Sequence, residues 1–199
     1  MKNFESFPGS ARPKEESPVE ANQKYYDEIK NENFENVNKI THLNKEAAEN
    51  LLKFSKIELD LQSLQELDAD TAKVLGGWEG KGTLILDGLK QLDSSAAEAL
   101  AERGGIGLSL RGLQQIDSST AEALAGWKGD ILALNGLQQL DEKTTEALAE
   151  WGGESLFLNK LQSEGIDDNT IAILKKIDAK LDLKVNDDIK NRIEGGGGE

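Results

Sequence analysis

Five aspartates recur along the chain at intervals of 24 to 26 residues, at Asp68, Asp93, Asp117, Asp141 and Asp167. Carboxylate oxygens are the ligands that calcium prefers, but a calcium ion needs about six to eight oxygens that converge on one point. One carboxylate in each interval does not supply that density. Every one of these aspartates precedes a helix-forming segment, and aspartate in that place typically caps a helix N-terminus. The pattern therefore predicts helix N-caps and no metal site.

The other residues that commonly carry chemistry are scarce. His42 is the only histidine and there is no cysteine, so catalytic and metal-binding schemes built on imidazole or thiolate have almost nothing to use. The stretch Gly76–Thr83, GGWEGKGT, has the wrong glycine spacing for a phosphate loop, and we expect it to be a turn after a helix. We predict that the protein is not an enzyme and takes no cofactor.

One sequence column holds three tryptophans, Trp78, Trp127 and Trp151, together with Phe54, Arg103 and Ile177. A ladder of aromatic side chains could serve as a stacking platform for sugars or bases. Alternatively, each indole packs over a glycine-rich turn and closes one end of the core. The column favours packing, because neither Phe54 nor Ile177 suits sugar stacking.

The charge of the chain limits its partners. Asp and Glu number 37 against 23 Lys and Arg, which gives a formal net charge of −14. Nucleic-acid binding relies on clustered basic residues, so we expect no such partner. The sequence has no apolar run of the roughly 18 residues that a membrane helix needs, and no membrane partner is expected. These features are typical of a cytoplasmic protein, although secretion without a classical signal peptide stays open.

The elements that would position these residues form a repeat. Leu-x-Leu pairs begin at Leu59, Leu84, Leu108, Leu132, Leu156 and Leu181, at spacings of 24 or 25 residues. In each unit an alternating stretch predicts a short strand, and the Ala-, Glu- and Leu-rich stretch after the aspartate predicts a helix. Ser95–Glu98 and Ser119–Glu122 also fit a capping box. A unit this short cannot offset its loss of backbone entropy alone, so stacked neighbours must stabilise one another.

Stacking of such units predicts an α/β fold with one parallel sheet. Neighbouring strands lie about 4.8 Å apart, whereas packed helices lie about 8–10 Å apart. The helical side must therefore fan out, which bends the stack into an arc with the strands on its inner face and the helices outside.

Strand-plus-helix units with a Leu-x-Leu strand resemble leucine-rich repeats over about residues 36–185. The likeness is greatest to the divergent, alanine-rich LxLxGLxxL…AEALA repeats of uncharacterised bacterial proteins. Leu89, Leu113 and Leu137 stand where leucine-rich repeats have a buried asparagine. The resemblance implies a right-handed β/α solenoid that binds other macromolecules and has no chemistry of its own.

The ends of the chain differ from the repeats. Residues 1–22 contain all three prolines and are expected to be disordered, and residues 23–34 are expected to form a helical cap. The repeat solenoid is predicted over 35–185, with one degenerate repeat, five clear repeats and a final strand. A C-terminal cap is expected over 186–193, with Ile189 and Ile193 facing inward, and 194–199 as a flexible tail.

The residues between the buried leucines vary most from repeat to repeat and should lie on the inner face. One row is expected to contain Asp60, Ile85, Ser109, Ala133 and Phe157, and a second row Gln62, Asp87, Arg111, Asn135, Asn159 and Lys184. A mixture of apolar and polar residues is typical of an interface core, although a plain solvated face is the alternative. The candidate partner-binding residues are Ile85, Asp87, Ser109, Arg111, Ile131, Asn135, Phe157 and Asn159.

The sequence thus favours a scaffold that binds another protein through its inner strand face, with a monomer slightly favoured. Two alternatives remain at this point. One is a structural component that self-assembles end to end or through its outer helices. The other is a secreted effector that uses residues 1–22 as an export segment.

Overall fold

The computed structural model describes residues 18–31, 33–53 and 58–195, with the backbone alone for 18–21. The described chain begins with α1 (Pro18–Lys30), the 3-10 helix η1 (Val37–Lys39) and α2 (Lys45–Leu52). Strands and helices then alternate as β1 (Leu59–Asp60), α3 (Ala69–Gly76), β2 (Thr83–Ile85), α4 (Ser94–Ala101), β3 (Gly107–Ser109), α5 (Ser118–Ala125), β4 (Ile131–Ala133), α6 (Glu142–Ala149), β5 (Ser155–Leu158), α7 (Asp168–Lys180), β6 (Asp182–Val185) and α8 (Asp187–Glu194).

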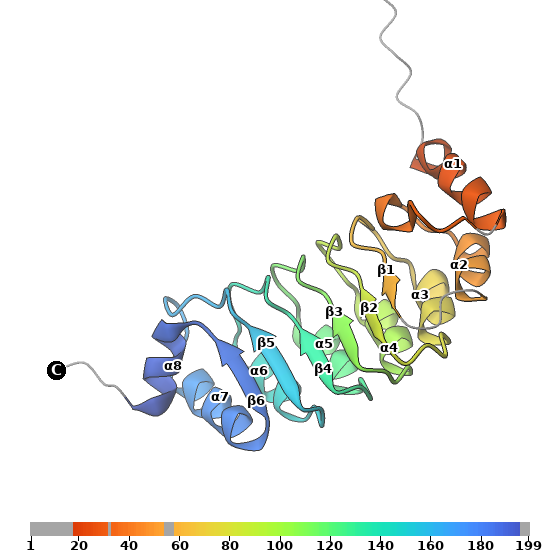
Figure 1. The fold of residues 1–199 in the computed structure, drawn as a ribbon. Coiled ribbons are helices and arrows are strands. Elements are labelled where there is room, and N and C mark those ends of the chain that lie inside the picture. Colours follow the sequence, from red (N-terminus) through yellow and green to blue (C-terminus); the bar gives the residue numbers. More distant parts are fainter. Residues whose placement is uncertain (1–17, 32, 54–57, 196–199) are drawn as a thin grey trace, which may run out of the picture.

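The six strands form one parallel sheet in the order in which they occur in the chain. The predicted leucine alignment is confirmed for the interior repeats, where Leu84 lies opposite Leu108 and Leu108 lies opposite Leu132. Figure 1 shows the strands side by side along an arc, with helices α3 to α7 all behind the same face of the sheet. These features confirm the predicted α/β class with a single parallel sheet and leave the other face of the sheet uncovered.

The core lies between the sheet and the helices. Leu86, Leu110 and Leu134 are fully buried, and the backbone N–H of each donates to a carbonyl of the next strand. A glycine two residues after the second leucine of the strand, as at Gly112, allows this close stacking. A Cβ atom added at Gly112 would lie 2.1 Å from the carbonyl oxygen of Asp87 in the preceding repeat. No side chain fits at that distance.

The predicted aspartate caps are confirmed. Each of the five aspartates is the N-cap of its helix and accepts a hydrogen bond from the backbone N–H three residues later. The predicted capping boxes Ser95–Glu98 and Ser119–Glu122 are wrong. Because Asp93 and Asp117 already take the N-cap position, these serines lie inside the first turn of α4 and α5.

The register of the last strand differs from the prediction. Leu183, not Leu181, lies opposite Leu156, and Lys184 lies opposite Phe157. The physical cause is α7, which has 13 residues where α6 has 8. The longer helix shifts β6 along the chain, and Lys184 therefore belongs to the row of Phe157 rather than to that of Asn159.

The two ends of the stack are covered. Helix α1 runs from Pro18 to Lys30, whereas the sequence suggested a cap over 23–34, and its Tyr26 and Ile29 are buried in the core. At the other end, Ile189 and Ile193 of α8 are buried as expected. Residues 1–17 and 196–199, which include most of the predicted N-terminal segment and tail, lie outside the described residues.

Candidate binding surface

The face of the sheet that the helices leave uncovered is called the open sheet face here. Its side chains alternate along each strand with the buried leucines, and neighbouring strands bring equivalent positions together. From β2 to β5 it is formed by Thr83, Ile85, Asp87, Gly107, Ser109, Arg111, Ile131, Ala133, Asn135, Ser155, Phe157 and Asn159. All eight residues predicted to bind a partner are among them.

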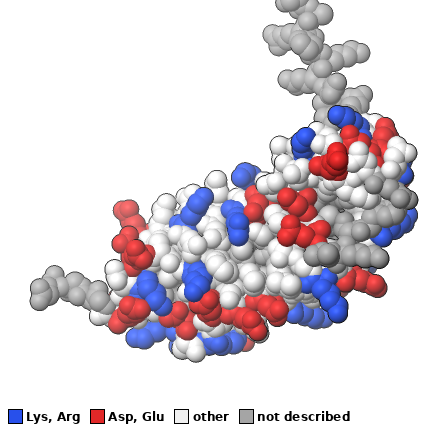
Figure 2. Space-filling model, viewed as in Figure 1, with Lys and Arg blue, Asp and Glu red and all other residues white. Residues whose placement is uncertain are grey.

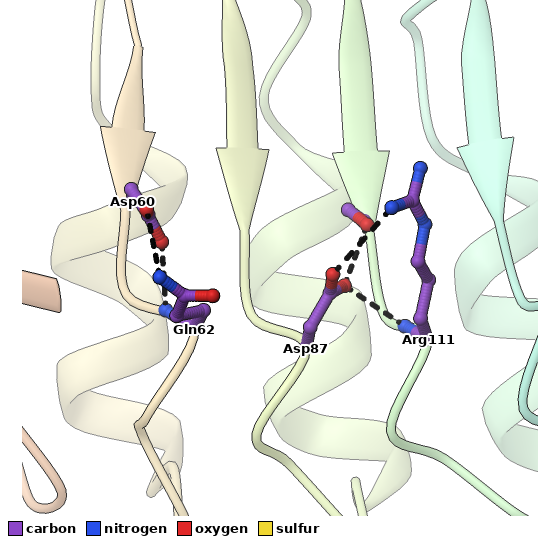
Figure 3. Close-up of polar contacts among 5 residues, drawn as sticks. Asp60, Gln62, Asp87 and Arg111 are labelled. Carbon is purple, nitrogen blue, oxygen red and sulfur yellow. Dashed lines mark hydrogen bonds and ion pairs between the residues drawn. The ribbon is translucent and has the colours of Figure 1, made fainter.

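A hydrogen-bond cluster joins the ends of β2 and β3. The hydroxyl of Ser109 donates to Asp87 at 2.6 Å, and the backbone N–H of Arg111 donates to the same carboxylate at 3.1 Å. Figure 3 shows this cluster beside Asp60, which accepts from the backbone N–H of Gln62. Two donors of the neighbouring repeat thus hold Asp87 through the same oxygen, Oδ1.

Ser109 contributes to the surface only indirectly. It was predicted to contact a partner, but it is 5% exposed and its hydroxyl is committed to Asp87. The small side chain lets Asp87 reach across from β2 to β3. We therefore assign Ser109 the role of positioning Asp87.

The guanidinium of Arg111 is the most available charged group of this region. Its side chain is 61% exposed, and its ion pair with Asp87 is long, at 3.9 Å between Nη1 and Oδ2. In Figure 3 the side chain runs back alongside β3. Because this ion pair is longer than a hydrogen bond, most of the donors of Arg111 are available for a carboxylate of another molecule.

Apolar side chains flank small ones on the open sheet face. Across β2 to β5 one row reads Ile85, Ser109, Ala133 and Phe157. The two outer members are partly exposed, whereas Ser109 and Ala133 are buried. Large side chains at both ends of a row of small ones can hold an apolar group of a partner between them.

Two asparagines follow this row. Asn159 is exposed, and Asn135 is partly buried. Among the described residues, the Oδ1 atom of Asn135 has no hydrogen-bond partner. That atom is buried, so the exposed amide of Asn159 is the one that can pair with the backbone of an extended peptide.

The open sheet face is nearly uncharged over β3 to β5. Its nine positions from Gly107 to Asn159 include no carboxylate, and Arg111 is their one charged residue. Figure 2, in the same view as Figure 1, shows a largely uncharged middle of this face, with both basic and acidic side chains around it. This contrast is marked in a chain whose net charge is −14.

Sequence reasoning missed part of the surface. Thr83 and Ser155 lie in the same row as Ile131, because each of them directly precedes the first leucine of its strand and the strands are paired in register there. Ile131 was recognised for its apolar side chain. Thr83 and Ser155 lie two residues before Ile85 and Phe157, so the alternation of side chains along the strands predicts that they share the same face.

The tryptophan column lies away from this surface and is buried. Trp78, Trp127 and Trp151 are 4%, 3% and 0% exposed, so packing is confirmed and a stacking platform is wrong. The indole N–H of Trp151 donates to the carbonyl of Trp127 at 2.9 Å. Arg103 and Ile177 of the same column are also buried, and Phe54 lies outside the described residues.

No family model matches the chain, and neither a curated protein nor a solved structure matches it significantly. In the part of the chain that the structure describes, no three His, Asp or Glu side chains are grouped so that they could hold a metal ion. None of the described helices is both long and apolar enough to cross a membrane. The surface itself must therefore carry the functional argument.

Proposed function

We propose that this chain is a non-enzymatic scaffold, a right-handed β/α solenoid of the leucine-rich-repeat type, that binds a protein through its open sheet face. The observation that carries the proposal is the composition of that face over β3 to β5. It combines an available guanidinium, partly exposed Ile131 and Phe157, and asparagine amides, without a carboxylate. Interfaces typically combine aromatic and arginine anchors with few other charges.

The surface favours a particular kind of partner segment. We expect an extended stretch with an apolar side chain and a nearby carboxylate. The apolar side chain would lie between Ile85 and Phe157, and the carboxylate would pair with Arg111. Backbone amides of such a stretch can pair with the exposed Asn159. The net charge of −14 would repel partners that are acidic throughout.

A double variant tests the assignment. We expect Arg111→Ala with Phe157→Ala to abolish partner capture in quantitative affinity purification from the native cell, with thermal unfolding almost unchanged. The matched control is Lys143→Ala with Lys176→Ala, which alters two exposed lysines of α6 and α7. Equal recovery of the same proteins by the double variant and the wild type would refute the surface.

Self-assembly is the second candidate function, and the last strand argues against one form of it. Asp182 and Lys184 stand exposed on β6 and form an ion pair of 2.8 Å. Charged residues on an outer strand oppose edge-to-edge pairing. The third candidate, a secreted effector, depends on residues 1–22, of which the structure describes only 18–22.

A further inference from the structure

Arg103 occupies a place in the tryptophan column that is unusual for an arginine. It is 2% exposed and lies just after α4. Its guanidinium carbon is 4.2 Å from the ring centroid of Trp78 and 5.3 Å from that of Trp127. The cation is therefore held between two indoles of the neighbouring repeats.

The hydrogen bonds of Arg103 are incomplete. Nη2 donates to the carbonyl oxygens of Gly80 and Gly82, at 2.9 and 3.0 Å. Nε and Nη1 are buried and have no acceptor among the described residues, and no described carboxylate forms an ion pair with this guanidinium. Burial lowers the pKa of Arg103 to about 10, which leaves it charged at neutral pH. A buried charge without a counter-ion is costly.

Trp127 lacks an acceptor at the same junction. In the next repeat the indole N–H of Trp151 donates to a backbone carbonyl one repeat earlier, but the buried Nε1 of Trp127 has no partner among the described residues. Three neighbouring nitrogens, Nε and Nη1 of Arg103 and Nε1 of Trp127, are thus unpaired. All of them are donors, and one group carries a positive charge. Buried unpaired groups of this kind call for an explanation.

The surface beside this junction is open. A shallow depression is lined by Arg103, Trp78, four glycines and Ile106. Ile106 is 51% exposed and is the one strongly exposed large apolar side chain in the described part of the chain. Gly104 has room for a side chain that the sequence does not place there. The glycine turn lies against the guanidinium, since a Cβ atom added at Gly105 would lie 2.7 Å from Nη2 of Arg103.

We propose that the Arg103–Trp127 junction binds a small monovalent anion, of the size of chloride or formate, between the guanidinium and the indole N–H. One such ion would accept hydrogen bonds from both groups and balance the buried charge. Glu79, Glu102 and Asp130 line the rim together with Lys81, so the rim is acidic on balance and opposes an anion of higher charge more strongly than a monovalent one. The unpaired nitrogens are closed to solvent in this conformation, and the ion enters by displacement of the Gly104–Gly105 turn. This site is independent of partner binding at the open sheet face.

The test compares sodium salts at constant ionic strength on the full chain. Gluconate is too bulky for the site, so replacing it by chloride should raise the thermal unfolding midpoint. At ten times its dissociation constant, an anion that binds only the folded state raises the ratio of folded to unfolded chain about elevenfold. Bromide should quench tryptophan fluorescence saturably, and chloride should compete with it. A formate arm shows whether a carboxylate can replace the halide.

Three variants decide the outcome. Arg103→Met removes the charge and the donors, and Arg103→Trp installs the residue that both neighbouring repeats carry in this column. Both should lose the chloride dependence, whereas Arg111→Met, which removes an exposed arginine, should keep it. If Arg103→Met does not fold, Arg103→Trp gives the answer. An equal chloride response in the wild type and in Arg103→Trp, or no response in the wild type, would overturn the proposal.

Discussion

The hydroxyl of Ser109 donates a hydrogen bond of 2.6 Å to the carboxylate of Asp87, which lies one repeat earlier in the chain. This bond adds a side-chain link between the ends of β2 and β3 to the backbone hydrogen bonds that pair the two strands. It also fixes the carboxylate that stands closest to the guanidinium of Arg111. A structural contact and a candidate binding group are therefore coupled at this point.

Ser109→Ala should lower the free energy of unfolding by about 1 kcal/mol, because Asp87 loses its shortest hydrogen bond and retains partial access to water. Chemical denaturation monitored by circular dichroism measures the change. Ser155→Ala, a partly exposed serine at the start of β5, is the matched control and should change stability less. Equal losses in both variants would mean that the bond to Asp87 contributes nothing.

The aspartate caps should make stability depend on acid. Hydrogen bonds from the backbone N–H and the hydroxyl of Thr120 lower the pKa of Asp117, and the pKa of Asp167 is lowered in the same way by Thr170. A carboxyl whose pKa is lower in the folded state stabilises the fold above its unfolded pKa. That contribution is lost as the pH falls through the folded value. Stability should therefore decline below about pH 4.

Asp117→Asn isolates this effect, since asparagine caps a helix about as well as aspartate but does not titrate. At pH 7 the variant should lose the electrostatic share of the cap, and the difference from the wild type should shrink as the pH falls from 5 to 2, about the range in which paired carboxyls titrate. Thermal midpoints across this series measure it. A difference that stays constant with pH would show that the charge of Asp117 does not matter.

Gly112→Ala should destabilise the protein by about 1–3 kcal/mol, the range for side chains forced into a packed core. The new methyl would lie 2.1 Å from the carbonyl oxygen of Asp87, so adjacent repeats must move apart. Gly152→Ala is the control, because nothing lies within 4 Å of its added Cβ. We expect that variant to stay within about 0.5 kcal/mol of the wild type in denaturant titrations.

The charged residues of β6 should keep the protein from pairing edge to edge. We expect light scattering at high protein concentration to give the mass of a monomer. Asp182→Val together with Lys184→Val should promote association, since it replaces two exposed, ion-paired charges of the outer strand by apolar side chains. A monomeric double variant would show that other features protect this edge.

The interior repeats could be predicted from the sequence because two independent patterns agree there. Leucine spacing placed Leu84 and Leu108 side by side, and the aspartates marked where each helix begins. The last strand could not be placed in the same way. The Leu-x-Leu pair at Leu181 suggested a regular spacing, but α7 has 13 residues where α6 has 8, and this longer helix shifts the register of β6.

The candidate surface was predictable for similar reasons, apart from its finer contacts. Alternation along the strands brought Ile85, Arg111 and Phe157 onto one face. It could not show that Ser109 turns its hydroxyl to Asp87, because that depends on a side-chain rotamer and on the neighbouring repeat. Nor could it show that Arg103 would be buried, since arginine is a residue that normally lies at the surface.

The consecutive order of the six strands means that no pairing in the sheet skips a repeat. A further strand-plus-helix repeat could be inserted between β3 and β4. Its strand would pair with β3 on one side and with β4 on the other, through the same parallel hydrogen bonds that now join β3 and β4. Tandem duplication of the coding sequence could therefore lengthen the open sheet face without disturbing the existing core. The length of the open sheet face is a trait that evolution can adjust in whole units.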